Sequence, residues 1–113
     1  MNNLELFKDI KPIARNSVVN VASVPQRSPF RYPGGKTWLI PVVRRWLGYF
    51  KQDEITLVDC FAGGGIVSLT AAFENLAKHI VMIELDEDVA AVWKTILGED
   101  NEWLANKIFT FEL

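Results

Sequence analysis

Two short glycine turns carry the residues of this chain that could bind a charged ligand. The first, at residues 33–36, reads PGGK, and the second, at residues 59–65, reads DCFAGGG. Each precedes an amphipathic stretch typical of a helix. Free N–H groups and partial positive charge gather at a helix start, and a turn without Cβ atoms lets a ligand approach them. The acid Glu84 closes the next apolar run. This order is typical of a site for a nucleoside-bearing cofactor.

Ser68, Asp59 and Glu84 favour one kind of cofactor. A dinucleotide site would have a third glycine at position 68, where this chain has Ser68. The carboxylate of Asp59 would also repel the pyrophosphate of a dinucleotide. It would attract the positively charged amino group or sulfonium of S-adenosylmethionine. Glu84 follows Gly65 by 19 residues, close to the spacing of an acid that accepts hydrogen bonds from ribose hydroxyls. A dinucleotide-binding oxidoreductase is therefore the disfavoured alternative.

Each motif also has an explanation that needs no ligand. Glycines between a strand and a helix occur in many α/β proteins, and PGGK can form a type II turn with Lys36 in solvent. Glu84 can cap the helix that follows it. Arg44 and Arg45 suit a solvated helix face better than a DNA-binding patch, and Cys60 suits a small buried hydrophobic position. The function depends on the motifs in combination.

Hydrophobic periodicity predicts the elements that position these residues. A helix is expected over 37–50, with Pro41 in its first turn, Gly48 near its end, and an apolar face made of Leu39, Val42, Val43, Trp46, Leu47 and Phe50. A second helix is expected over 65–77, with its inner face at Ile66, Leu69, Phe73 and Leu76. A third begins at Asp86 or Glu87 and ends at Gly98, with its inner face at Val89, Val92, Trp93, Ile96 and Leu97.

Two strands alternate with these helices. Residues 55–59 form an expected buried strand, and residues 79–84 form a second one, in which 80–83 is apolar on both faces, as expected for a parallel strand covered by helices. The βαβα order predicts a doubly wound α/β arrangement. Residues 103–111 are apolar and ambiguous between helix and strand. Residues 1–28 form an expected N-terminal arm, with a short helix over 4–10 and either a weak strand or an extended segment over 17–24. Residues 29–113 form the expected domain.

Composition limits the class of protein. The chain has 113 residues, half of them hydrophobic, which suits one domain. One cysteine and one histidine exclude a disulfide framework, argue against a zinc site and fit a reducing cytoplasm. No apolar run reaches the length of a membrane span. The net charge of −2 argues against DNA binding over the whole surface, although basic residues cluster over 27–45.

In this order, the motifs resemble those of the Dam-like adenine-N6 DNA methyltransferases. The resemblance covers residues 29–97 and rests on the segments FRYPGGK at 30–36, DCFAGGG at 59–65 and IELDED at 83–88. It implies a Rossmann-like methyltransferase domain that binds S-adenosylmethionine and methylates a flipped adenine in DNA. The implied cofactor-binding residues are Tyr32, Gly34, Gly35, Lys36, Asp59, Phe61, Ala62, Gly63, Gly64, Gly65, Glu84 and Leu85.

The resemblance also implies a role for each part of the site. Tyr32 and the PGGK turn line the methionine end, with Lys36 on the carboxylate. Asp59 and the backbone of 61–65 hold the amino-acid part and the ribose side. Glu84 accepts the ribose hydroxyls, and Leu85 packs on the adenine ring.

One departure from the family is large. Its catalytic Asp/Asn-Pro-Pro-Tyr motif follows the acid strand, and this chain contains no Pro-Pro pair. No catalytic or metal-binding residue is therefore predicted. The chain is expected to be a cofactor-binding part, truncated before the catalytic motif, inactive by itself and prone to self-association through a free sheet edge. The alternative is a non-catalytic remnant that acts as a ligand-binding or protein-interaction module.

Overall fold

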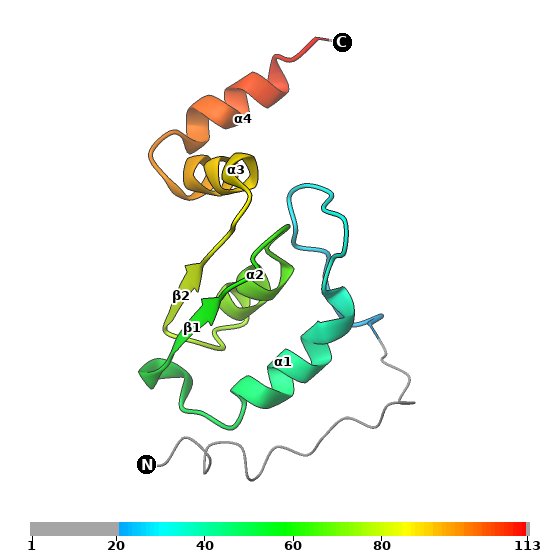
Figure 1. Cartoon of the computed structure of the whole chain (residues 1–113), viewed down its shortest axis with the longest axis vertical. Coiled ribbons are helices and arrows are strands. Elements are labelled where there is room, and N and C mark those ends of the chain that lie inside the picture. Colours follow the sequence, from blue (N-terminus) through cyan, green and yellow to red (C-terminus); the bar gives the residue numbers. More distant parts are fainter. Residues whose placement is uncertain (1–20, 113) are drawn as a thin grey trace.

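The computed structural model describes residues 21–112, which form a mixed α/β fold with four helices and a small parallel sheet (Figure 1). The elements are α1 (Ile40–Leu47), β1 (Thr56–Asp59), α2 (Ile66–Phe73), β2 (His79–Met82), α3 (Glu87–Leu97) and α4 (Asn101–Phe109), with short 3₁₀ turns at Thr37–Leu39 and Gln52–Glu54. The expected helix over 4–10 lies outside the described residues. Of the expected strand or extended segment over 17–24, residues 21–24 form a turn instead, closed by a 3.0 Å hydrogen bond from Val24 N–H to the Val21 carbonyl.

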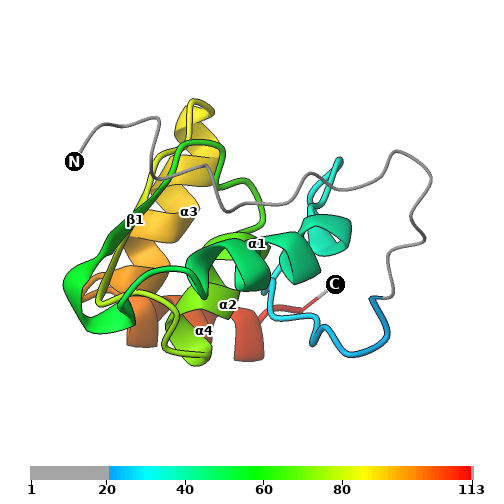
Figure 2. The ribbon, with the colours of Figure 1, turned by 90° about the horizontal axis from the view of Figure 1, so that it is seen from below.

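The predicted parallel sheet is confirmed. The two strands pair in parallel with Leu57 opposite Ile80 and Asp59 opposite Met82, and α2 makes the crossover between them. Figures 1 and 2 show α2 beside the sheet and α1 on the far side of α2, in agreement with the contacts between these elements. The sheet, α2 and α1 therefore form three successive layers.

The expectation that both strands are covered on both faces is wrong for the described residues. Val58, Val81 and Ile83 remain 48%, 45% and 48% exposed. The reason is that α1 stacks on α2 and does not cross to the opposite face. Leu57 and Ile80 face α2, and the alternating side chains of each strand face solvent.

The buried surface of α2 is wider than the inner face predicted for this helix. Because it lies between the sheet and α1, Val67, Thr70 and Ala71 are buried as well as Ile66. The helix ends early, at Phe73, which was expected on the inner face but is exposed. The predicted inner face of α3 is also too wide, because Trp93 is buried while Val92 and Leu97 are exposed. The core consists of Val24, Ile40, Val43, Leu47, Leu57, Ile66, Val67, Ala71 and Ala77.

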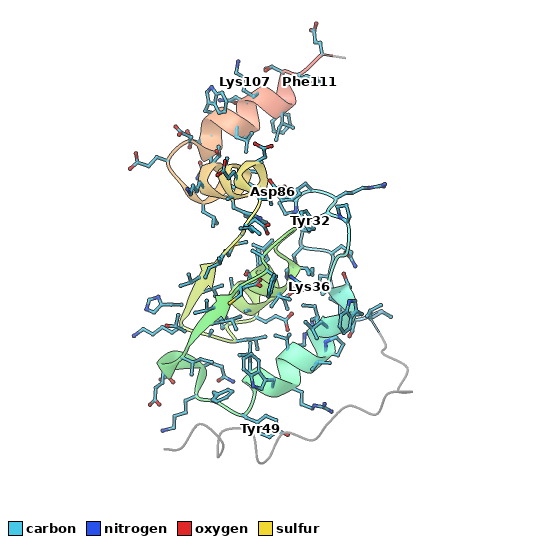
Figure 3. All side chains as sticks on the ribbon, in the orientation of Figure 1. Tyr32, Lys36, Tyr49, Asp86, Lys107 and Phe111 are labelled. Atoms are coloured by element: carbon cyan, nitrogen blue, oxygen red, sulfur yellow. The ribbon has the colours of Figure 1, made fainter. Side chains whose placement is uncertain are left out.

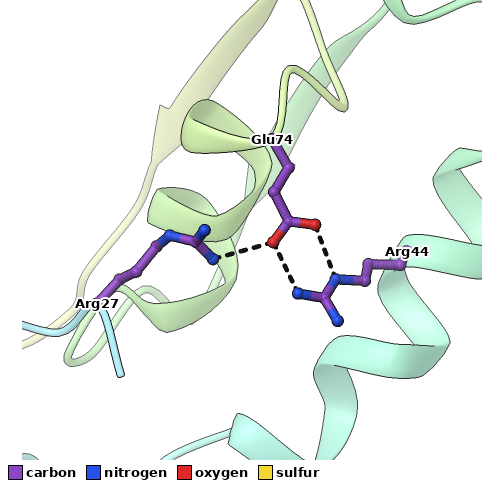
Figure 4. Close-up of polar contacts among 3 residues, drawn as sticks. All are labelled: Arg27, Arg44 and Glu74. Carbon is purple, nitrogen blue, oxygen red and sulfur yellow. Dashed lines mark hydrogen bonds and ion pairs between the residues drawn. The ribbon is translucent and has the colours of Figure 1, made fainter. Parts of the chain in front are cut away.

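An ion-pair cluster joins α1, α2 and the segment before the PGGK turn (Figure 4). Arg44 Nε and Nη2 each donate to Glu74 at 2.8 Å, and Arg27 Nη1 donates to it at 2.9 Å. Arg27 also lies over the Phe73 ring, 5.4 Å from its centroid. Of the expected solvated face, Arg45 is exposed, but Arg44 is only partly so, because the Glu74 carboxylate at the end of α2 accepts two hydrogen bonds from its guanidinium.

This cluster makes stability depend on pH. The hydrogen bonds from Arg44 lower the pKa of Glu74 from 4.5, and those from Arg27 act in the same direction against burial. The stabilisation from Glu74 is present above about pH 4.5 and is lost as the pH falls through the lower folded-state pKa. Because the Glu74 side chain keeps 26% exposure, we expect Glu74→Gln to cost about 1 kcal/mol at pH 7.

Urea unfolding of both proteins between pH 7 and pH 3 checks this expectation. The difference between wild type and Glu74→Gln should shrink below about pH 4.5. Glu54→Gln is the matched control, because Glu54 pairs with Lys51 at 3.8 Å with both side chains mostly exposed. An equal pH-dependent loss in the control would contradict the assignment to Glu74.

The ambiguous segment near the end of the chain is helical. Most of it forms α4, which lies against α3 and away from the sheet, with Lys107 near the outer end of the helix and Phe111 just beyond it (Figures 1 and 3). No α4 residue is buried, and Trp103, Ile108, Phe109 and Phe111 are all exposed, with Phe109 at 89%. This helix therefore adds little to the core of the described residues.

Candidate functional site

A cleft of about 1300 Å³ opens between three segments at one end of the sheet. These are the loop at residues 28–36, called here the PGGK loop, the turn at residues 59–65, called here the glycine turn, and the end of β2. Ten of the twelve predicted cofactor-binding residues line the cleft: Tyr32, Gly34, Gly35, Lys36, Phe61, Ala62, Gly63, Gly64, Glu84 and Leu85. The other two, Asp59 and Gly65, do not.

The topology explains why segments so far apart in sequence meet. The carboxyl ends of parallel strands lie at the same edge of a sheet, so the glycine turn after β1 lies beside Glu84 after β2. The Ile83 N–H donates to the Asp59 carbonyl at 2.8 Å, and the Ala62 N–H donates to the Ile83 carbonyl at 3.0 Å. The PGGK loop reaches the same edge because α1, which follows it, packs on α2.

The PGGK loop touches the glycine turn directly. Lys36 Nζ donates a hydrogen bond to the carbonyl of Phe61. The Tyr32 ring lies so close to Gly63 that a Cβ there would be 2.9 Å from Tyr32 Cε1, and Gly63 has φ +50°. A side chain at position 63 would therefore be strained and would push against Tyr32, which explains the glycine.

Glu84, which lines the cleft, accepts hydrogen bonds from two backbone N–H groups. Its Oε2 accepts from the Gly63 N–H at 2.6 Å, and its Oε1 accepts from the Asp86 N–H at 3.1 Å. An ionised carboxylate offers about four acceptor positions, so about two remain for a ligand. Glu84 does not cap α3, since the Asp86 side chain does so by accepting from Asp88 N–H at 2.9 Å and Val89 N–H at 3.2 Å.

Asp59 supports the glycine turn from outside the cleft. Its Oδ2 accepts from Ser68 Oγ at 2.7 Å, and its Oδ1 accepts from the Phe61 N–H at 3.3 Å. Asp59 and Ser68 are both buried and lie outside the cleft lining. The two residues that depart from the dinucleotide pattern are thus bonded to each other. The Asp59 carboxylate therefore gives no reason to prefer a cationic ligand over a pyrophosphate in this cleft.

Gly65 is the last residue of the glycine turn and lies against Trp93 of α3. It has φ +78°, and a Cβ there would be 2.4 Å from Cζ2 of Trp93. Trp93 is 4% exposed, and its Nε1 donates to the carbonyl of Gly63 at 2.7 Å. Its ring also meets Phe30 of the PGGK loop, with 5.5 Å between the ring centroids. Sequence reasoning assigned Trp93 to the core and missed its link to both parts of the site.

Further residues line the cleft that the sequence did not single out as binding residues: Gln26, Ser28, Pro29, Phe30, Arg31, Pro33, Thr37, Cys60, Ile66 and Ile83. Phe30, Arg31 and Pro33 belong to the segment that carries the family resemblance, so their position was a signal. Gln26 and Ser28 belong to no recognisable motif. Cys60 is exposed, contrary to the expectation of a buried residue.

Comparison of the chain with models of protein families, with curated proteins and with solved structures finds no match. Within residues 21–112, no helix is long and apolar enough to cross a membrane. The same residues contain no group of three or more His, Cys, Asp or Glu side chains placed to hold a metal ion.

Proposed function

We propose that this chain is the S-adenosylmethionine-binding portion of an adenine-N6 DNA methyltransferase. The observation that carries the proposal is the convergence of three separate sequence segments on one cleft, with Glu84 at its floor and Lys36 at its wall. These are the segments on which the resemblance rests. Open α/β sheets bind ligands in crevices at the carboxyl ends of their parallel strands, which is where this cleft lies.

Each residue's position suits the role that the resemblance implies. Lys36 uses one donor on the Phe61 carbonyl, and the two that remain suit a carboxylate. The free acceptor positions of Glu84 suit a pair of ribose hydroxyls. Leu85 is 95% exposed at the cleft mouth, so an adenine ring packed on it would cover apolar surface. Asp59 acts indirectly in this proposal, by holding the glycine turn through Phe61 N–H.

The complete enzyme would add what these 113 residues lack. The chain has no Asp-Pro-Pro-Tyr motif, so we propose that it does not methylate DNA by itself and that DNA is a partner of the complete enzyme in the cytoplasm. The sheet face at Val58, Val81 and Ile83 is open among the described residues. This supports a partial doubly wound, Rossmann-like domain in which further helices cover the second face.

Calorimetric titration with S-adenosylmethionine tests the proposal. We expect saturable binding by the wild type and about tenfold weaker binding by Lys36→Ala, since losing a charge-assisted bond to a carboxylate costs about 1.5 kcal/mol. Lys51→Ala is the matched control, because Lys51 is exposed and does not line the cleft. NADH, titrated in parallel, represents the oxidoreductase alternative. Preference for NADH, or no binding of either ligand, would contradict the proposal.

The exposed apolar surface of α4 favours a second candidate, a non-catalytic interaction module. Trp103, Phe109 and Phe111 are exposed together, and an aromatic side chain buries about 150–250 Å² when covered. We expect the isolated chain to self-associate by covering these rings or by pairing the free edge of β2. Sedimentation at micromolar concentration should detect dimers that Phe109→Ser and Trp103→Ser weaken. A monomer for the wild type would contradict this expectation.

A further inference from the structure

The peptide unit between Gly63 and Gly64 is held from one side only. The Gly63 carbonyl accepts from Trp93 Nε1 at 2.7 Å, and Trp93 lies outside the cleft lining. Trp93 lines a second cavity, of about 570 Å³, between α2, β2 and α3. The Gly63 carbonyl therefore points away from the cleft, toward α3.

The orientation of that carbonyl determines the orientation of the next N–H. No peptide bond in the described residues is cis, and in a trans peptide the C=O and the following N–H point in opposite directions. With the Gly63 carbonyl turned toward Trp93, the Gly64 N–H points toward the cleft, which Gly64 itself lines. Among residues 21–112, no acceptor pairs with the Gly64 N–H.

The neighbouring peptide unit is held by a different group. Glu84 Oε2 accepts from the Gly63 N–H at 2.6 Å, and the Gly65 N–H donates to the Ala62 carbonyl at 2.7 Å. Of the three glycine N–H groups, that of Gly63 is therefore satisfied by Glu84 and that of Gly65 by the Ala62 carbonyl. That of Gly64, which lines the cleft, is available to a ligand.

We propose that Trp93 is a positioning residue, which aims the Gly64 N–H at an acceptor oxygen of the cofactor. This inference deepens the proposed function and rests on it for the identity of the ligand. Trp93 does not touch the ligand. Its indole N–H fixes the orientation of the Gly63 carbonyl, and its ring packs against Gly65 and Phe30. The indole thereby links α3 to a donor on the opposite side of the turn.

The test compares Trp93→Phe with wild type, using Trp46→Phe as the matched control. Phenylalanine keeps an aromatic ring in place but has no donor for the Gly63 carbonyl. Trp46 is also partly buried, but it lies in α1 against Phe50 and outside the cleft lining. We expect Trp93→Phe to bind S-adenosylmethionine about tenfold more weakly and Trp46→Phe to bind as wild type does.

Amide ¹⁵N–¹H spectra supply a readout that a general loss of stability would not move. The Gly64 amide should shift when wild type binds the cofactor, and also in ligand-free Trp93→Phe. The Gly48 amide, which follows α1 and lines neither cavity, should shift in neither case. An unchanged Gly64 amide in ligand-free Trp93→Phe, or wild-type affinity of that variant, overturns the inference. If wild type binds no S-adenosylmethionine, the proposed function fails, and the ligand-free spectrum still decides the role of Trp93.

Amide exchange in the wild type keeps the inference testable if Trp93→Phe does not fold. Slow exchange of the Trp93 indole N–H together with fast exchange of the ligand-free Gly64 N–H supports it. Fast exchange of the indole N–H, or a protected Gly64 N–H, overturns it.

Discussion

Gly65→Ala is expected to destabilise the protein by about 3 kcal/mol, from about 1–2 kcal/mol of left-handed backbone strain and a similar cost of overpacking. Gly65 has φ +78°, and the new Cβ would be 2.4 Å from Cζ2 and 2.7 Å from Cη2 of Trp93. Trp93 is buried and bonded to Gly63, so its ring has little freedom to move. A loss of this size is a large part of the about 5–15 kcal/mol that stabilises a typical domain. Urea unfolding followed by circular dichroism measures it.

Gly34 provides the matched control for this substitution. It has φ +77°, nearly the same backbone conformation, but a Cβ there would have nothing within 4 Å. Gly34→Ala should therefore cost only the strain, about 1 kcal/mol. The difference between the two variants isolates the contact with Trp93. Equal losses would mean that Trp93 does not pack against Gly65 as described.

Glu84→Gln is expected to weaken S-adenosylmethionine binding about 30-fold, because removing the charge from two hydrogen bonds to ribose hydroxyls costs about 2 kcal/mol. The amide oxygen of glutamine can still accept from the Gly63 N–H, so the glycine turn should remain in place. Calorimetric titration gives the affinity, and urea unfolding of the same samples should show a loss of stability well below the loss in binding free energy.

Glu87→Gln controls for the change in net charge. Glu87 is exposed at the start of α3 and does not line the cleft. We expect this variant to bind the cofactor as wild type does. Equal weakening by both variants would indicate a general electrostatic effect and would contradict a direct role for Glu84.

Much of the fold could be predicted because local patterns determine it. The short apolar runs located both strands, and the helical periodicity located all three helices, between residues 37 and 98 to within a few residues. Asp86 before α3 and Gly48 after α1 lie where capping preferences place such residues. Parallel pairing followed from the short strand, helix, strand order, since a helical crossover joins parallel strands.

The grouping of the cleft residues could also be predicted, because the edge at which parallel strands end is a property of topology. Once β1 and β2 are parallel, the glycine turn and Glu84 must meet at the same edge. The PGGK loop was placed there by resemblance to a family and not by any local pattern. The packing of α1 on α2 is what brings Tyr32 and Lys36 to that edge.

The sequence by itself determined the elements between residues 37 and 98, their parallel order and the meeting of the glycine turn with Glu84, since these depend on helical periodicity, on apolar runs and on topology. The packing of α1 on α2 added the PGGK loop to the cleft. Only the tertiary structure decided which way the polar side chains point. It turned Asp59 toward Ser68, paired Arg44 with Glu74 and bonded Trp93 to the Gly63 carbonyl. Each of these contacts joins residues from different parts of the fold. Their partners are therefore set by packing in three dimensions, which no local pattern in the chain records.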